Sequence, residues 1–211
     1  MITNYKSILG EYHIKQKVGA CKFYGSTKEV TSKEEADAFI ESVKEKFPNA
    51  THYVYAYRIG VGNNYTERYT DDGEPTNSSG PPVLQSIKGK DLNNIIVVVT
   101  RYYGGVNQGV GGLIRAYGST ATLVLEQADI VNYYLFQEFE VNPVEYSQLG
   151  DIIHFVESYN GTIKNIKYGA NVAVKAVLEN NMIDKFKVKV RDITKGEGKF
   201  ILGDLVWKRK K

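Results

Sequence analysis

The sequence has only one cysteine, Cys21, in 211 residues, together with three histidines and one tryptophan. A single thiol excludes an intramolecular disulfide and also a zinc site built on several cysteines. The first 16 residues, MITNYKSILGEYHIKQ, lack the apolar core of a signal peptide, and no run of about 18 apolar residues occurs. We therefore expect a cytoplasmic protein that has no contact with a membrane.

An excess of one charge is absent from most of the chain. Residues 1–135 carry 14 basic and 14 acidic side chains, whereas residues 136–211 carry 13 and 10. The net charge of +3 therefore lies in the second part, and the last four residues, KRKK, are enough to supply it. Such a cluster keeps a protein soluble, and it can also contact phosphates or an acidic surface.

Apolar periodicity and turn residues predict an α+β chain of two domains, at 1–133 and 134–211. In the first domain, Ser32 and Glu35 form a capping box before an apolar helical stripe, and Pro48 ends that helix. The stretch TDDGEPTNSSGPP (70–82) predicts an irregular loop. The expected elements are strands near 9–17, 21–28, 51–60 and 94–103 and helices near 31–47, 83–91 and 110–130.

The second domain is predicted from the order of its elements. After a segment at 134–143 come a helix, two strands, a second helix and a last strand that ends near residue 207. This β-α-β-β-α-β order is typical of the ferredoxin-like fold.

A glycine-rich loop follows the apolar strand at 94–103. Residues 101–119 read RYYGGVNQGVGGLIRAYGS, with six glycines in nineteen residues. Glycines let backbone N–H groups approach a ligand, and the helix that follows adds the positive end of its dipole. Arg101 and Arg115 could hold an anion at this loop. The sequence matches neither the P-loop nor the dinucleotide fingerprint, and a tight packing turn is the alternative interpretation.

The segment DDGEP groups three carboxylates, those of Asp71, Asp72 and Glu74, around Gly73 and before Pro75. Such a group could bind Mg²⁺ or divide acid and base roles. It is equally good turn chemistry, and its carboxylates could pair with the two arginines of the glycine loop. We expect turn and ion pair, no metal and no cofactor.

Aromatic residues accompany the glycine loop. Tyr102 and Tyr103 adjoin it, and tyrosines alternate at 53, 55 and 57. Aromatic rows beside arginines can stack nucleic-acid bases, and they can equally be half-buried residues of a sheet. No serine stands in a strand–serine–helix elbow, so hydrolase chemistry is not indicated.

Three stretches taken together resemble the Impact family, whose bacterial members are called YigZ-like: THYVYAYRIG, TDDGEP, and NNIIVVVTRYYGGVNQGVGGLIRAYG. The similarity in order and spacing covers residues 15–125. Two departures lower the positive charge of the loop. Asn107 and Gln108 stand where members often have a lysine, and Pro81 replaces an arginine.

The resemblance implies a fold for each domain and a role in translation. The first domain would share the fold of domain two of a small-subunit ribosomal protein, domain IV of elongation factor G and the ribonuclease P protein. The second would be ferredoxin-like, as in domain V of elongation factor G. Eukaryotic relatives regulate translation under starvation by binding a ribosome-associated activator of a stress kinase. The family has no established catalytic residues, so its motif positions are carried over only as a functional surface.

Three functions remain open at this point. The first is a non-enzymatic nucleic-acid- or ribosome-binding protein in translation regulation, which we favour. The second is a Mg²⁺-dependent enzyme acting on a phosphorylated small molecule, and the third is a protein-interaction adaptor for the translation machinery. The expected anion- or nucleic-acid-binding residues are His52, Arg58, Arg101, Tyr102, Tyr103, Gly104, Gly105, Gly109, Gly111, Gly112, Arg115 and Tyr117. The expected acidic loop comprises Asp71, Asp72, Gly73, Glu74 and Pro75.

Overall fold

The computed structural model describes residues 2–209, which form a mixed α+β chain with two sheets and five α-helices. These residues divide into two compact units. The N-terminal unit is Tyr5–Asn132, and the C-terminal unit combines residues 2–4 with residues 133–209. Within the described residues, no helix has both the length and the apolar character needed to cross a membrane.

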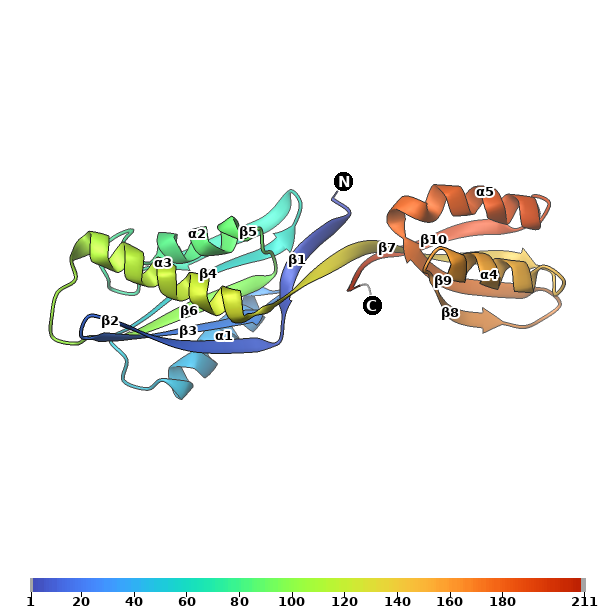
Figure 1. Cartoon of the computed structure of the whole chain (residues 1–211). Helices are drawn as coiled ribbons and strands as arrows, with labels where there is room; N and C mark the ends of the chain where they lie inside the picture. The colour runs from blue at the N-terminus through green and yellow to red at the C-terminus, as the bar shows by residue number, and fades with distance from the viewer. Residues whose placement is uncertain (1, 210–211) are drawn as a thin grey trace. The chain divides into compact units, whose positions relative to one another are not determined.

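A five-stranded antiparallel sheet forms the centre of the N-terminal unit (Figure 1). Its strands, in spatial order, are β2 (Glu11–Val18), β3 (Cys21–Glu29), β6 (Ile95–Tyr102), β4 (His52–Val61) and β5 (Asn64–Thr70). The middle strand, β6, is buried from Ile95 to Arg101, because helices cover both faces of the sheet at this strand. The predicted central strand is confirmed.

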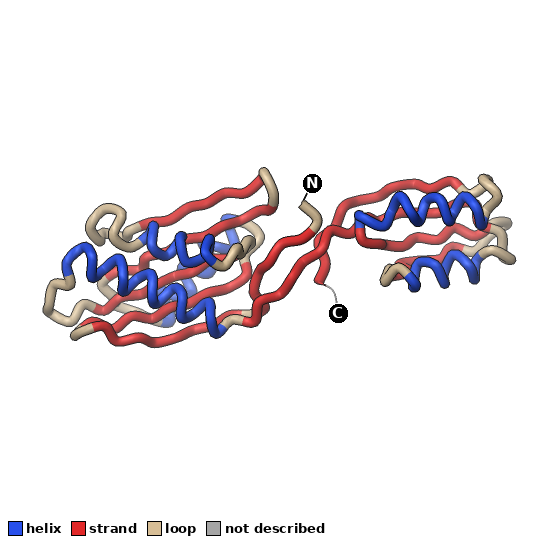
Figure 2. Tube along the Cα trace, turned by 45° about the horizontal axis from the view of Figure 1, so that its top comes forward, coloured by secondary structure: helices blue, strands red, loops and turns tan. Residues whose placement is uncertain are grey.

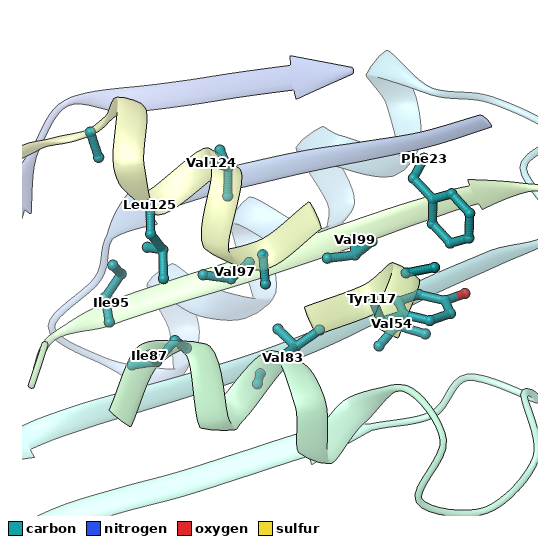
Figure 3. Close-up of a cluster of buried hydrophobic side chains, with 14 of the residues drawn as sticks. Phe23, Val54, Val83, Ile87, Ile95, Val97, Val99, Tyr117, Val124 and Leu125 are labelled. Carbon is teal, nitrogen blue, oxygen red and sulfur yellow. The ribbon is translucent and has the colours of Figure 1, made fainter. Parts of the chain in front are cut away.

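Two helices, α2 (Gly80–Gly89) and α3 (Gly109–Gln127), lie on one face of this sheet, and α1 (Lys33–Lys46) lies on the other. Figure 3 shows Val97 and Val99 of β6 among the buried side chains of α2 and α3. The stripe of α3 that packs here recurs every three or four residues, as one face of a helix requires. Its buried members are Leu113, Ala116, Tyr117, Thr120, Ala121, Val124 and Leu125.

The capping chemistry of α1 follows the sequence. The Ser32 hydroxyl accepts the Glu35 N–H at 3.2 Å, and the Glu35 carboxylate accepts the Thr31 N–H at 2.6 Å. Acidic residues lie in the first turn and lysines in the last, where each complements the helix dipole. The helix runs from Lys33 to Lys46, so the helix predicted near 31–47 is confirmed, with its start two residues later and its end one residue earlier.

Two local predictions for the N-terminal unit were wrong. A strand, β1 (Asn4–Leu9), precedes the first expected strand, and its Ile8 is fully buried in the main core. Helix α2 begins at Gly80 rather than at Val83, so two prolines lie in its first turn. Proline suits that turn because the N–H it lacks would have no intrahelical partner there.

The C-terminal unit has the element order that the sequence predicts. Its elements are β7 (Asp129–Val144), α4 (Leu149–Ser158), β8 (Thr162–Lys167), β9 (Val172–Glu179), α5 (Ile183–Ile193) and β10 (Lys199–Arg209), with a 3₁₀ turn at Asn180–Met182. The sheet is five-stranded and follows the order β1-β7-β9-β8, and β10 also pairs with β7. The pairs of β10 with β7, β7 with β9 and β9 with β8 are antiparallel. Helices α4 and α5 pack on one face of them (Figure 2), around Phe139 and Phe186, whose ring centroids are 5.2 Å apart.

Candidate functional site

Arg101 and Glu74 form a buried ion pair in the N-terminal unit. Arg101 Nη1 lies 2.6 Å from Glu74 Oε1, and the two side chains are 5% and 3% exposed. The other terminal nitrogen of Arg101 donates to Cys21 Sγ at 3.4 Å. The acidic loop and the strand before the glycine loop are therefore joined by a charge pair, which is one of the arrangements open at the sequence level. Arg101 is consequently turned inward and not toward solvent.

Two further side chains converge on Glu74. The Tyr117 hydroxyl donates to Glu74 Oε1 at 2.6 Å, and burial, together with this carboxylate, raises the pKa of Tyr117 far above its ordinary value. His52 Nδ1 lies 2.7 Å from the Asp72 carbonyl oxygen, which can only accept, so Nδ1 carries the proton. His52 Nε2 then faces Glu74 at 3.7 Å. The network satisfies a buried carboxylate with donors and contains no exposed nucleophile.

Asp71 caps α2 from outside the helix. Its carboxylate accepts the backbone N–H groups of Asn77, Ser79 and Gly80 at 2.7, 3.0 and 2.8 Å, and also the Ser79 hydroxyl at 2.7 Å. Burial by itself raises the pKa of Asp71, but these hydrogen bonds outweigh it and hold the pKa below its ordinary value. The carboxylate thus replaces the side-chain N-cap that α2 lacks.

The remaining acidic-loop residues shape the turn. Asp72 and Gly73 both have positive φ, at 45° and 83°, and the Asp72 carboxylate accepts the Tyr53 N–H at 2.6 Å. Each of the three carboxylates of the acidic loop therefore has its own protein partner. Among residues 2–209, no group of three or more His, Cys, Asp and Glu side chains is placed to hold a metal ion.

The glycine loop packs against the turn between β2 and β3. A Cβ atom on Gly104 would lie 2.2 Å from the Ala20 carbonyl oxygen, so only glycine fits at this approach. Gln108 donates to the Val18 carbonyl at 2.9 Å, which ties the end of the loop to the same turn. One side of the loop thus packs against the β2–β3 turn, and residues 103–107 and 109–111 are exposed on the other side.

The start of α3 presents unused donors to solvent. No side chain caps this helix end, and Gly109, Val110 and Gly111 are exposed. Arg115 is also exposed, and its Nη1 would lie 3.6 Å from a Cβ atom on Gly111, so the guanidinium folds back toward the first turn. Arg115 forms no ion pair with any residue in the described part of the chain. Free N–H groups, a dipole end and an unpaired guanidinium are the groups that bind an oxyanion.

A cleft adjoins the loop on the face of the sheet that carries α1. It is lined by Ala20, Lys22, Tyr24, Tyr102, Tyr103 and Gly104. Tyr102 is half-buried with its hydroxyl bound to the Pro48 carbonyl at 3.0 Å, whereas Tyr103 is 45% exposed. The sequence does not predict Lys22 and Tyr24 as site residues, because it does not show which strand residues stand beside β6.

Arg58 lies apart from the other expected residues. It is six residues from His52 along β4, about 20 Å at the rise of a strand. Its Nε faces Glu67 at 3.4 Å and its guanidinium covers the Tyr65 ring at 4.7 Å. The expected residues therefore fall into an exposed loop with Arg115, a buried network around Glu74, and Arg58 at a distance.

Comparisons with known proteins add the family. The Impact N-terminal domain matches residues 19–125, and a domain of unknown function, DUF1949, matches residues 144–197. The IMPACT family member YvyE of Bacillus subtilis is 32% identical over 201 residues, 95% of this chain and 91% of that protein. The IMPACT family member YigZ of Escherichia coli is 34% identical over 164 residues, 77% of this chain and 80% of that protein. A crystal structure described as that of an hypothetical protein aligns with a TM-score of 0.68 at 27% identity, covering 97% of this chain and 99% of that one.

Proposed function

Because the chain belongs to the IMPACT family, we propose that it is a non-enzymatic protein that binds RNA or the ribosome and acts in the regulation of translation. The phosphate contact in this proposal is the exposed side of the glycine loop, the first turn of α3 and Arg115. The proposed role in translation rests on the translation-linked role of the eukaryotic relatives. The proposed phosphate-bearing ligand rests on the chemistry of the glycine loop.

One observation carries the proposal: Arg115 is exposed and unpaired at an uncapped helix N-terminus. A buried arginine such as Arg101 already has its counter-ion, but Arg115 leaves its charge available to a ligand. A phosphate placed there would accept backbone N–H groups and a bidentate guanidinium contact together. The polymer is favoured over a nucleotide because the loop has no lysine and matches neither the P-loop nor the dinucleotide-binding fingerprint.

The buried network supports a structural role for the acidic loop. The carboxylates of the acidic loop already have partners within the protein. Glu74 forms an ion pair, Asp71 caps a helix, and Asp72 accepts a hydrogen bond from a strand N–H. A Mg²⁺-dependent enzyme would need several of these oxygens turned toward one metal ion. The geometry therefore favours binding over catalysis at this site.

We also propose a fold for each of the two units. For the C-terminal unit, the β-α-β-β-α-β order and the strand order β10-β7-β9-β8, with both helices on one face, favour a ferredoxin-like domain. For the N-terminal unit we propose the fold of domain two of the small-subunit ribosomal protein. The domain assignment 1–133 and 134–211 is part of this proposal.

The proposal is tested by cosedimentation of the purified protein with ribosomes and by RNA binding over a salt series. We expect the logarithm of the RNA affinity to fall linearly with the logarithm of salt concentration, as counterion release requires. Arg115→Ala should weaken RNA binding by about 1–3 kcal/mol and should lower the salt slope by about one unit. Arg68→Ala, at another exposed arginine of the same unit, is the matched control.

Binding that is indifferent to salt, or equal in the Arg115 and Arg68 variants, would remove the phosphate contact from the loop. A lowered melting temperature in Arg115→Ala with unchanged RNA binding would make Arg115 a packing residue. Either result would leave the family membership in place and end the proposed mode of binding.

A protein-interaction adaptor is the second candidate, and one observation favours it. Val106, Val110 and Ile114 of the loop and α3 are 63%, 53% and 41% exposed, beside Tyr103. Exposed apolar residues grouped at one place are typical of protein contacts. A partner bound there would be displaced by Val110→Asp at any salt concentration, whereas an RNA contact through Arg115 would weaken as salt rises.

A further inference from the structure

The α1-bearing face of the N-terminal sheet is covered over only part of its area. The buried side chains of α1 pack with Tyr57 of β4 and with Ile96 and Val98 of β6. Toward the glycine loop the helix ends, and residues of β2, β3 and β6 are left uncovered on this face. Their cross-strand register places two rows of side chains there.

The first row reads lysine, lysine, tyrosine across three strands. Lys17 of β2 stands opposite Lys22 of β3, and Lys22 stands opposite Tyr102 of β6. The second row pairs Lys15 with Tyr24, and Lys15 Nζ lies 5.7 Å from the centroid of the Tyr24 ring. All three lysines are exposed, and none forms an ion pair with a residue that the structure describes.

The cross-strand pair of Lys17 and Lys22 is unfavourable for the stability of the sheet. Like charges directly opposite each other on neighbouring strands destabilise a sheet. By contrast, Lys28 of β3 has the Glu11 carboxylate of β2 beside it at 3.4 Å. A repulsive pair kept without a local acid is relieved when an anion binds between the two ammonium groups, so the pair itself argues for a negatively charged occupant.

The tyrosines of these rows are held in fixed positions. Tyr24 packs on Phe47, with centroids 4.6 Å apart, and meets Tyr102 edge to face at 5.8 Å. The Tyr102 hydroxyl is bound to the Pro48 carbonyl. With Tyr103 and Lys22 these rings line the cleft of about 330 Å³ beside the glycine loop. Rigid aromatic walls next to unpaired lysines are the components of a single-stranded nucleic-acid site, where rings stack bases and cations follow the backbone.

We propose that a single-stranded RNA segment crosses this face, with one base in the cleft of Tyr24, Tyr102 and Tyr103 and phosphates on Lys15, Lys17 and Lys22. The inference rests on the proposed function and adds a second contact surface to it, around the β2–β3 turn from Arg115. A duplex does not satisfy the site, because paired and stacked bases cannot reach a ring recessed in a cleft.

The test is fluorescence anisotropy of the full chain with a labelled eight-nucleotide oligouridine over a salt series. Lys17→Ala/Lys22→Ala should weaken binding and lower the salt slope by roughly 1.4, since each single-strand phosphate contact contributes about 0.7. Tyr102→Leu should weaken binding about 5- to 150-fold, the effect of one lost base stack, with an unchanged slope. Tyr102→Phe keeps the ring and should keep the affinity.

The matched control for charge is Lys33→Ala/Lys88→Ala, which removes two exposed lysines of the same unit elsewhere on its surface. It should leave the affinity within about twofold and the slope unchanged. Thermal melting of each variant separates a loss of binding from a loss of fold. If Tyr102→Leu does not fold, the pair Lys17→Ala/Lys22→Ala and the comparison of single strand with duplex still decide the question.

Three results would overturn the inference, and they separate it from the proposed function. If Arg115→Ala weakens binding while the lysine and Tyr102 variants do not, the loop contact stands and the sheet face is not a site. If a duplex of the same length competes as well as the single strand, the cleft does not hold a base. If the wild-type protein binds no RNA at low salt, both ideas fail.

Discussion

Replacing Arg101 with methionine should be among the most destabilising single changes in the N-terminal unit. The substitution keeps most of the side-chain volume but removes the guanidinium that is paired with Glu74, whose side chain is 3% exposed. What remains for the carboxylate is the Tyr117 hydroxyl at 2.6 Å and His52 Nε2 at 3.7 Å. A buried carboxylate without its cation is therefore left behind.

Removing one member of a buried ion pair costs about 3–5 kcal/mol, because the partner stays buried and uncompensated. For a unit of this size that loss lowers the melting temperature by roughly 10–20 °C. Arg115→Met, at an exposed and unpaired arginine, should change stability by no more than about 0.5 kcal/mol. The double variant Arg101→Met/Glu74→Met should recover much of the loss, since apolar residues of similar volume often replace a buried pair at little cost.

The assay is urea unfolding followed by circular dichroism, with the four proteins arranged as a double-mutant cycle. A strong coupling between Arg101 and Glu74 is expected, and the cycle separates it from the loss of each side chain alone. The reasoning is refuted if Arg101→Met and Arg115→Met cost the same. It is equally refuted if the double variant is as unstable as the sum of its single changes.

Three further outcomes are expected. Asp71 has a depressed pKa in the folded state, so its contribution to stability is present above its unfolded pKa of about 3.9 and is lost as the pH falls from there through the folded value. Asp71→Asn should therefore flatten the fall in melting temperature below about pH 4, and an unchanged acid limb would contradict this cap. Gly104→Ala should cost about 1–3 kcal/mol because its Cβ would meet the Ala20 carbonyl, whereas Gly89→Ala, with open space around it, should not destabilise; equal melting temperatures for the two would contradict the close approach. Phe186→Ala should cost about 3–5 kcal/mol in urea unfolding, since this fully buried ring packs on Phe139, and a cost below about 1 kcal/mol would contradict that packing.

Long periodic segments of this chain were predictable, and short irregular ones were not. The stripe of α1 with its Ser32 cap and the apolar run of β6 carry strong local signals. Strand β1 does not, because Ser7, a polar residue, is buried there through a hydrogen bond to the Asn94 carbonyl far along the chain. The start of α2 is also missed, because its first turn contains two prolines and the sequence up to them predicts a loop. Proline is in fact favoured in the first turn of a helix.

The sequence names candidate site residues, which stay a prediction, but it does not show how the fold arranges them. The sequence places two arginines around the glycine loop, and only the fold separates Arg101, turned inward to Glu74, from Arg115, which is exposed. The local sequence pattern does not show which arginine is buried, since burial depends on which face of β6 or α3 each residue occupies. The lysine pair opposite each other on β2 and β3 is hidden for the same reason: register becomes visible only once the hairpin is formed.

The positions of the outer strands bear on how this protein can be divided for study. The matched Impact N-terminal domain begins at residue 19, yet β2 lies before that residue, and so does Ile8 of the core. The second match, at 144–197, contains neither β10 nor more than the last residue of β7, the strand paired on both sides in its sheet. A fragment cut at either set of limits would expose unpaired strand edges that invite intermolecular pairing. The division between the two units, at residues 4/5 and 132/133, falls inside β1 and β7, so a cut there would sever those strands as well. The full chain is therefore the form in which both strands stay whole.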